Sequence, residues 1–211
     1  EHTSRGIGDV YKRQNQFNES HFGKTIARTY FDEREFNDET LKKFEIGSLG
    51  SEKYNLRDHC LSMGYNTDDL EALGLISSKN QMDIYRSRLI FPIKSISGRT
   101  IGFGARILDN NKKSAKYINS PDSIIYNKSN VLFGLYNSKN EIVKKDNCFI
   151  AEGYTDVMRF HQIGIKNIVS SSGTALTVSQ INLIRRLTKN VTMLFDSDKA
   201  GVNACLLYTS D

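Results

Sequence analysis

The chain has little proline and no long apolar run. Only 2 of its 211 residues are proline and 38% are hydrophobic, a composition that favours a globular protein over a disordered one. No apolar stretch approaches the roughly 18 residues of a membrane span, and no charged start with an apolar stretch and a small-residue cleavage site indicates export. We therefore expect a cytoplasmic protein with one or two domains and no membrane partner.

Cysteine is also scarce. Cys60, Cys148 and Cys205 are odd in number and lie too far apart for a Cys-x-x-Cys zinc element. This pattern fits a reducing compartment and argues against structural zinc within the chain.

Charge is unevenly distributed behind a net value of +5. Residues 31–83 hold 6 Lys and Arg against 12 Asp and Glu, whereas residues 86–145 hold 12 against 3 and are therefore +9 on their own. A basic block of this kind suits a polymer of phosphates, because cationic side chains gain affinity by releasing condensed counterions. A solvated lysine-rich surface explains the charge equally well.

The two ends of the chain differ from the rest. Val10–Gln14 and Cys205–Asp211 resemble translated sequencing-adapter read-through, so we expect the native coding segment to run from about residue 15 to 204. We predict a non-native or disordered leader over 1–20, a basic amino-proximal subdomain over 21–145, a truncated second subdomain over 146–204, and a non-native tail over 205–211.

Hydrophobic periodicity predicts the fold class. From Gly23 to Ser78 the pattern is helical, whereas Leu89–Ile93 and Ile101–Ile107 alternate as antiparallel strands do. After Asp146, short apolar runs alternate with helix-like segments. This rhythm predicts an α/β parallel sheet with flanking helices, preceded by a mixed α+β subdomain, so the whole chain is α+β. The expected strands are 149–151, 167–170 and 191–195, and the expected helices are 25–31, 40–44, 57–63, 67–73, 155–162 and 178–187.

Two of the predicted parallel strands lead into carboxylates. Glu152 follows the first, with Asp156 four residues later, and Asp196 and Asp198 follow the last. In open α/β sheets the carboxyl ends of the strands form the ligand-binding edge, and oxygen ligands there suit Mg²⁺ or Mn²⁺. Helix capping is the alternative for the first pair, and a turn for the second. If the two acidic motifs follow neighbouring strands of one sheet, a metal site shared by them is the better explanation.

Residues of the basic block are candidates for contacts with nucleic acid or nucleotide. Arginine binds phosphate in a bidentate manner, lysine acts as a point charge, and tyrosine can stack on a base. Each is also an ordinary surface or packing residue when taken alone. The candidates are Arg88, Arg106, Lys116, Tyr117 and Lys128.

Residues 22–204 resemble the RNA polymerase core of bacterial DnaG-type primases. The acidic motifs are similar to that family's Toprim signature, and the middle of the chain follows the primase order of motifs. These are Glu152-Gly-Tyr-Thr-Asp156, Asp196-Ser-Asp198, Arg88-Leu-Ile-Phe-Pro-Ile93, Gly98-Arg-Thr-Ile-Gly-Phe-Gly-Ala-Arg106, Lys116-Tyr-Ile-Asn-Ser-Pro121 and Leu132-Phe-Gly-Leu-Tyr136.

The resemblance implies a DNA primase, which joins ribonucleoside triphosphates on a single-stranded DNA template into a short RNA primer. It assigns catalytic metal to Glu152, Asp196 and Asp198, with Asp156 in support, and template or nucleotide contacts to the basic candidates. It also implies zinc only in an amino-terminal domain, and a replicative helicase bound through a carboxyl-terminal domain. Both domains are missing here, and the sequence stops before the next acidic motif, so the fragment alone is not expected to be fully active.

Two other functions fit part of the pattern. One is a single-stranded nucleic-acid-binding Toprim module without catalysis. The other is a haloacid-dehalogenase-like phosphatase with Asp196 as nucleophile and Asp198 as acid, although that motif would normally open such a fold.

Overall fold

The computed structural model describes residues 22–108, 114–171 and 175–195. They form two compact units. The first contains the described residues up to Ile93 together with those of Arg99–Asn127, and the second contains Lys94–Gly98 and the described residues from Lys128 onward. Within these ranges, no helix has the length and apolar character needed to cross a bilayer.

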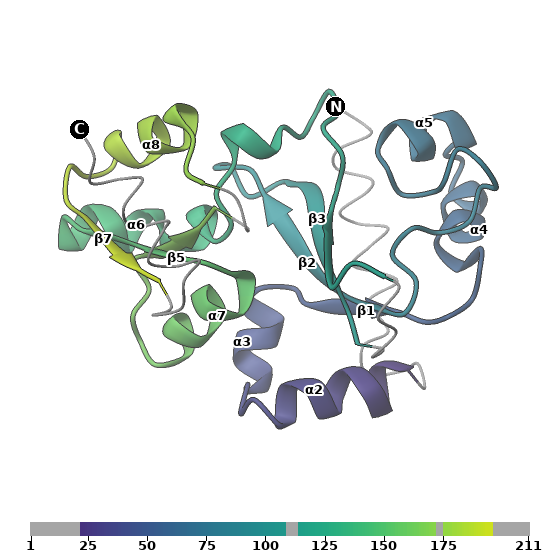
Figure 1. Ribbon diagram of the computed structural model, residues 1–211, viewed down its shortest axis with the longest axis horizontal. Coiled ribbons are helices and arrows are strands. Elements are labelled where there is room, and N and C mark those ends of the chain that lie inside the picture. Colours follow the sequence, from purple (N-terminus) through teal and green to yellow (C-terminus); the bar gives the residue numbers. More distant parts are fainter. Residues whose placement is uncertain (1–21, 109–113, 172–174, 196–211) are drawn as a thin grey trace. The chain divides into compact units, whose positions relative to one another are not determined.

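The first unit is built on a four-stranded sheet in the order β1-β2-β3-β4 (Figure 1). β1 runs antiparallel to β2, with Ser48 opposite Leu89, and β3 runs antiparallel to β4, with Ala105 opposite Ile118. The strands are β1 (Gly47–Leu49), β2 (Arg88–Lys94), β3 (Thr100–Ile107) and β4 (Tyr117–Asn119). The antiparallel strands predicted around residues 89–93 and 101–107 are confirmed.

Two helices of the first unit begin at N-cap side chains that accept hydrogen bonds. The Asn37 side chain accepts from the Thr40 amide, and the Asn66 side chain accepts from the Asp69 amide, both at 2.8 Å. These caps satisfy amides that have no partner inside the helix. The segments are a π-helical turn (η2, Phe22–Ala27), α2 (Arg28–Asp32), α3 (Asp38–Lys43), α4 (Asn55–Ser62) and α5 (Thr67–Ala72).

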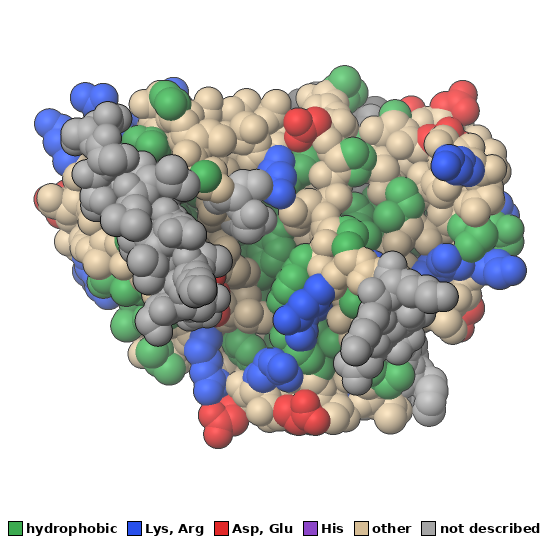
Figure 2. Space-filling model, viewed as in Figure 1, with side chains coloured by type: hydrophobic (Ala, Val, Ile, Leu, Met, Phe, Trp, Pro, Cys, Tyr) green, Lys and Arg blue, Asp and Glu red, His purple; other side chains and the backbone are tan. Residues whose placement is uncertain are grey.

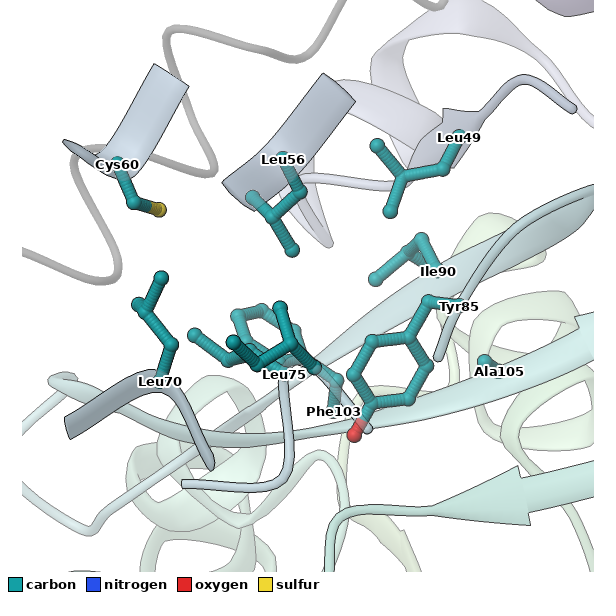
Figure 3. Packing of buried hydrophobic residues seen from close by; sticks show 10 residues of the cluster. Leu49, Leu56, Cys60, Leu70, Leu75, Tyr85, Ile90, Phe103 and Ala105 are labelled. Atoms are coloured by element: carbon teal, nitrogen blue, oxygen red, sulfur yellow. The ribbon is translucent and has the colours of Figure 1, made fainter. Parts of the chain in front are cut away.

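One core of the first unit lies between its sheet and the helices α4 and α5. Figure 3 shows Leu56 from α4 and Leu70 from α5 pointing toward Ile90 and Phe103 of the sheet. Tyr85 is 1% exposed in this core, and its hydroxyl lies 2.9 Å from the Ser120 hydroxyl. Burial raises the pKa of Tyr85 to about 12, so its phenol stays neutral and serves packing.

The second unit has the parallel sheet that the sequence predicts. Its order is β6-β5-β7, and β5 pairs in parallel with both neighbours. The elements are a 3₁₀ turn (η3, Lys128–Asn130), α6 (Leu135–Lys145), β5 (Cys148–Ala151), α7 (Tyr154–Gln162), β6 (Ile168–Ser170), α8 (Val178–Arg185) and β7 (Val191–Leu194). The alternation of strand and helix predicted after residue 146 is confirmed.

Two elements depart from the sequence predictions. The stretch predicted as helical from Gly23 to Ser78 contains β1, a strand of three residues that is too short to show a period of two. Helix α6 was not predicted, because its buried stripe of Leu135, Ser138 and Ile142 includes a serine. Ser138 is fully buried, and its hydroxyl donates to the Ile168 carbonyl at 2.7 Å.

The glycine of the Leu132–Tyr136 motif, Gly134, is required by the local backbone conformation. It directly precedes α6 with φ of 82°, a conformation that L side chains rarely adopt. A Cβ at this position would lie 2.7 Å from Cγ1 of Val157. Only glycine therefore allows α6 to begin here while α7 packs beside it.

Candidate metal and nucleic-acid sites

Glu152 lies at the carboxyl edge of the parallel sheet, as predicted. Ala151, the last residue of β5, is in register with Ser170 of β6 and Leu194 of β7. Glu152 is half-buried, and its backbone carbonyl accepts a hydrogen bond from the Ser170 hydroxyl at 2.8 Å. Neighbouring strands thus end together, and one side-chain hydrogen bond holds the backbone where the carboxylate emerges.

Asp156 caps the helix that follows. Gly153 is the N-cap of α7, and its amide donates to Oδ2 of Asp156 at 2.9 Å. The exposed carboxylate also lies in the first turn, where the helix dipole favours negative charge. The N-cap of α7 is thus Gly153 rather than Glu152, Asp156 occupies the first turn as the helix-dipole alternative expects, and a role of Asp156 as a metal ligand stays a prediction.

Asp196 and Asp198 lie outside the described residues. The described part of β7 ends at Leu194, in register with Ala151, and Phe195 then precedes Asp196 in the sequence. Over residues 22–108, 114–171 and 175–195, no three His, Cys, Asp or Glu side chains gather as a metal site would require. Glu152 and Asp156 are hard oxygen donors four residues apart, which fits a divalent cation that keeps water or substrate ligands as well.

Other reactive side chains of the described residues serve the fold. His161 is 4% exposed, and its Nε2 lies 2.9 Å from the Ser138 hydroxyl between α6 and α7, so its role is structural. Burial raises the pKa of Cys60 to about 11 and that of Cys148 to about 12. Both thiols stay protonated near neutral pH, so neither is an activated nucleophile.

The predicted cationic residues occupy different environments. Arg88 is only 7% exposed; its Nη1 donates to the Ala115 carbonyl at 3.0 Å, and burial lowers its pKa. Lys116 is exposed, whereas Lys128 is half-buried in the other unit, where its carbonyl accepts from the Gln180 amide group at 3.1 Å. Figure 2 shows Lys and Arg side chains exposed on the face drawn, several of them beside apolar surface.

The structure brings Arg106 and Tyr117 together. They are directly opposed on β3 and β4, and Cζ of Arg106 lies 5.7 Å from the centre of the Tyr117 ring. Tyr117 is 40% exposed and can therefore meet a base, whereas Tyr126 is 2% exposed and belongs to the core. Arg88 is on the opposite face from Arg106, because Ile90 of β2 and Ala105 of β3 share the core of Figure 3 and side chains alternate along strands.

Tyr30 was missed in the sequence. Its ring centre lies 4.2 Å from Cζ of Arg106 and 4.0 Å from Cζ of Arg34. Arg34 follows Tyr30 by four residues, in the turn after α2, but Arg106 lies far along the chain. No periodicity or motif signals a contact of that kind.

Comparisons with known proteins identify the family. Residues 11–139 match the DNA primase catalytic core, N-terminal domain, and residues 149–209 match a Toprim-like family. The DNA primase of Mycolicibacterium smegmatis is 40% identical over 185 residues, which cover 83% of this chain and 29% of that protein. The chain thus spans about 30% of the length of the curated relatives it matches.

Solved structures agree. The RNA polymerase domain of Mycobacterium tuberculosis primase DnaG, in complex with a double-stranded DNA oligomer with a 6-nucleotide overhang, matches at a TM-score of 0.91 and 32% identity, covering 100% of this chain and 69% of that one. A DnaG primase catalytic domain bound to single-stranded DNA matches at a TM-score of 0.85 and 32% identity, and the match covers 98% of this chain and 65% of that one. These matches favour the primase interpretation over the phosphatase alternative. The chain belongs to the family of the DNA primase catalytic core.

Proposed function

We propose that the protein to which this chain belongs synthesises short RNA primers from ribonucleoside triphosphates on single-stranded DNA. The observation that supports this most directly is the common edge of β5 and β7, where Glu152 follows one strand and the sequence Asp196-Ser-Asp198 follows the other. The relatives are named DNA primases, and the M. tuberculosis domain was solved with DNA.

The carboxylates would hold a divalent cation, and Mg²⁺ is our choice because the donors are hard oxygens. Glu152, Asp196 and Asp198 are the proposed ligands, with Asp156 in support. When bound, the cation would supply charge neutralisation at the attacking hydroxyl and at the leaving pyrophosphate. Ser170 would contribute indirectly, by fixing the backbone of Glu152 through the hydrogen bond to its carbonyl.

The basic residues would bind the template strand or the incoming nucleotide. Phosphate contacts from lysine and arginine fix the position of the nucleic acid without reading its sequence. Exposed Tyr117 would add stacking on a base. The proposed set is Arg88, Arg106, Lys116, Tyr117 and Lys128.

Metal-dependent RNA synthesis tests this function. The intact parent protein, given single-stranded DNA and ribonucleoside triphosphates, should extend RNA in Mg²⁺ and lose that synthesis in excess EDTA. Readdition of Mg²⁺ should restore it. Binding to DNA with no RNA product at any Mg²⁺ concentration would instead support the non-catalytic module.

Lys116 offers a separate test of the nucleic-acid surface. Lys116→Gln should weaken binding to single-stranded DNA of any sequence, and should lower the slope of log K against log salt by roughly 0.7 if one phosphate contact is lost. Lys79→Gln is the matched control, because Lys79 is an exposed lysine of the same unit outside the basic block. Fluorescence anisotropy over a salt series measures both slopes, and equal slopes for the two variants would contradict the assignment.

A further inference from the structure

The guanidinium of Arg106 has an unusual environment. Phe103 and Ala105 of β3 point into the core with α4 and α5, so Arg106 emerges from the opposite face of the sheet. There its Cζ lies 4.2 Å from the ring centre of Tyr30 on α2 and 5.7 Å from that of Tyr117 on β4. Two aromatic rings from different elements therefore contact one cation.

Two donors of Arg106 are buried but unused. Its Nε and Nη1 atoms are inaccessible to solvent and have no hydrogen-bond acceptor among the residues that the structure describes. Arg28 and Arg57 of this unit do find carboxylates, Asp32 at 2.9 Å and Asp58 at 2.7 Å, whereas Arg86 shares with Arg106 a buried Nε that has no acceptor among the described residues. Buried donors without acceptors are rare in folded proteins because leaving them unpaired is costly. Arg106 as a whole is only half-buried, so an acceptor from outside the chain can still reach part of its side chain.

The guanidinium of Arg106 favours a ligand with anionic oxygens. A planar guanidinium suits the paired oxygens of a phosphate, and ring contacts hold it without occupying any N–H group. The exposed part of Tyr117 adjoins Arg106 on the paired strand, and exposed Lys116 directly precedes that strand. A nucleic acid backbone would bring both a phosphate and a base to this region.

We propose that Tyr30 is a positioning residue for nucleic-acid binding. Its ring, together with that of Tyr117, holds the Arg106 guanidinium in place for a backbone phosphate. This inference rests on the proposed function and assigns it one further residue. Arg34 also contacts the Tyr30 ring. It donates from Nη1 to the Tyr30 carbonyl at 3.2 Å and lies 3.7 Å from a Glu33 carboxylate oxygen, so residues close to it in the chain account for its position.

A fluorination series at residue 30 tests the role of the ring. Tyr30→Phe should retain the affinity of the 211-residue chain for fluorescent oligo-dT, because the face of the ring is preserved. Replacing that Phe by mono-, di- and trifluoro-phenylalanine withdraws charge from the ring face at nearly constant shape. The affinity should then fall stepwise, to roughly 3–10-fold below the Phe variant, as expected for a cation–π contact. Packing alone would not give a graded response.

Arg106→Gln separates this inference from the proposed function. In an Arg106→Gln background the fluorination series should have no further effect, and the melting temperature should stay constant along the series. If Arg106→Gln weakens binding but fluorination does not, the positioning role of Tyr30 is wrong while the nucleic-acid site stands. If Arg106→Gln leaves affinity and salt slope unchanged, the phosphate site at Arg106 is wrong, and metal-dependent RNA synthesis still tests the proposed function separately.

Discussion

Glu152→Gln is expected to lower primer synthesis by the intact parent protein by roughly 10²–10³-fold, the size of effect seen when one transition-state stabilising group is removed. Glutamine has the same shape and keeps one carbonyl oxygen, but it cannot supply negative charge to a divalent cation. The backbone at this position is held by Ser170, so the fold should persist. The measurement is steady-state RNA synthesis over a Mg²⁺ series, with the melting temperature recorded beside it.

Glu141→Gln is the matched control for this experiment. Glu141 lies on α6 of the same unit, where its carboxylate oxygens are 4.0 Å from Nζ of Lys144 and 3.9 Å from Nζ of Lys145. Surface pairs of this kind contribute little to stability, so the variant should retain full synthesis. Equal synthesis by both variants would show that Glu152 is not a metal ligand.

The parallel sheet was predictable because local signals agree with its tertiary structure. The short apolar runs at 149–151, 167–170 and 191–195 predict strands, and the segments between them have the length of crossover helices. The position of Glu152 followed from the same rule, since parallel strands end at one edge. The missed helix α6 shows the limit, because Ser138 is buried for a hydrogen bond that only the folded chain reveals.

The basic site was less predictable. Charge counting identified the basic block of residues 86–145. It could not show that Arg88 and Arg106 lie on opposite faces of the sheet, because that depends on which face of the sheet packs against the hydrophobic core. The contact of Tyr30 with Arg106 joins α2 to β3 through tertiary packing. Sequence patterns report which residue types are present, whereas the orientation of long side chains is decided by neighbours from elsewhere in the chain.

Asp83 illustrates the same dependence at the start of α4. The N-cap residue Tyr54 makes no side-chain cap, and the distant carboxylate of Asp83 accepts from the Leu56 amide at 2.7 Å and from the Arg57 amide at 3.0 Å. Asp83 is 2% exposed, and this burial raises its pKa, although the two backbone hydrogen bonds oppose the shift. The carboxylate thus stabilises the helix while paying a desolvation cost.

Asp83→Ala should lower the free energy of unfolding by about 3 kcal/mol at pH 7, since two amides lose a charged acceptor and stay buried. Asp83→Asn keeps one acceptor oxygen and should lose about 1 kcal/mol of unfolding free energy.

The stability contributed by Asp83 should also depend on pH. Because the pKa of Asp83 is raised in the folded state, that state binds the proton more tightly than the unfolded state, in which the pKa is about 4. The corresponding stability is complete below that value and is lost as the pH rises through the folded pKa. Wild type should therefore lose stability relative to Asp83→Asn across this window in urea unfolding, and a constant difference would contradict the raised pKa.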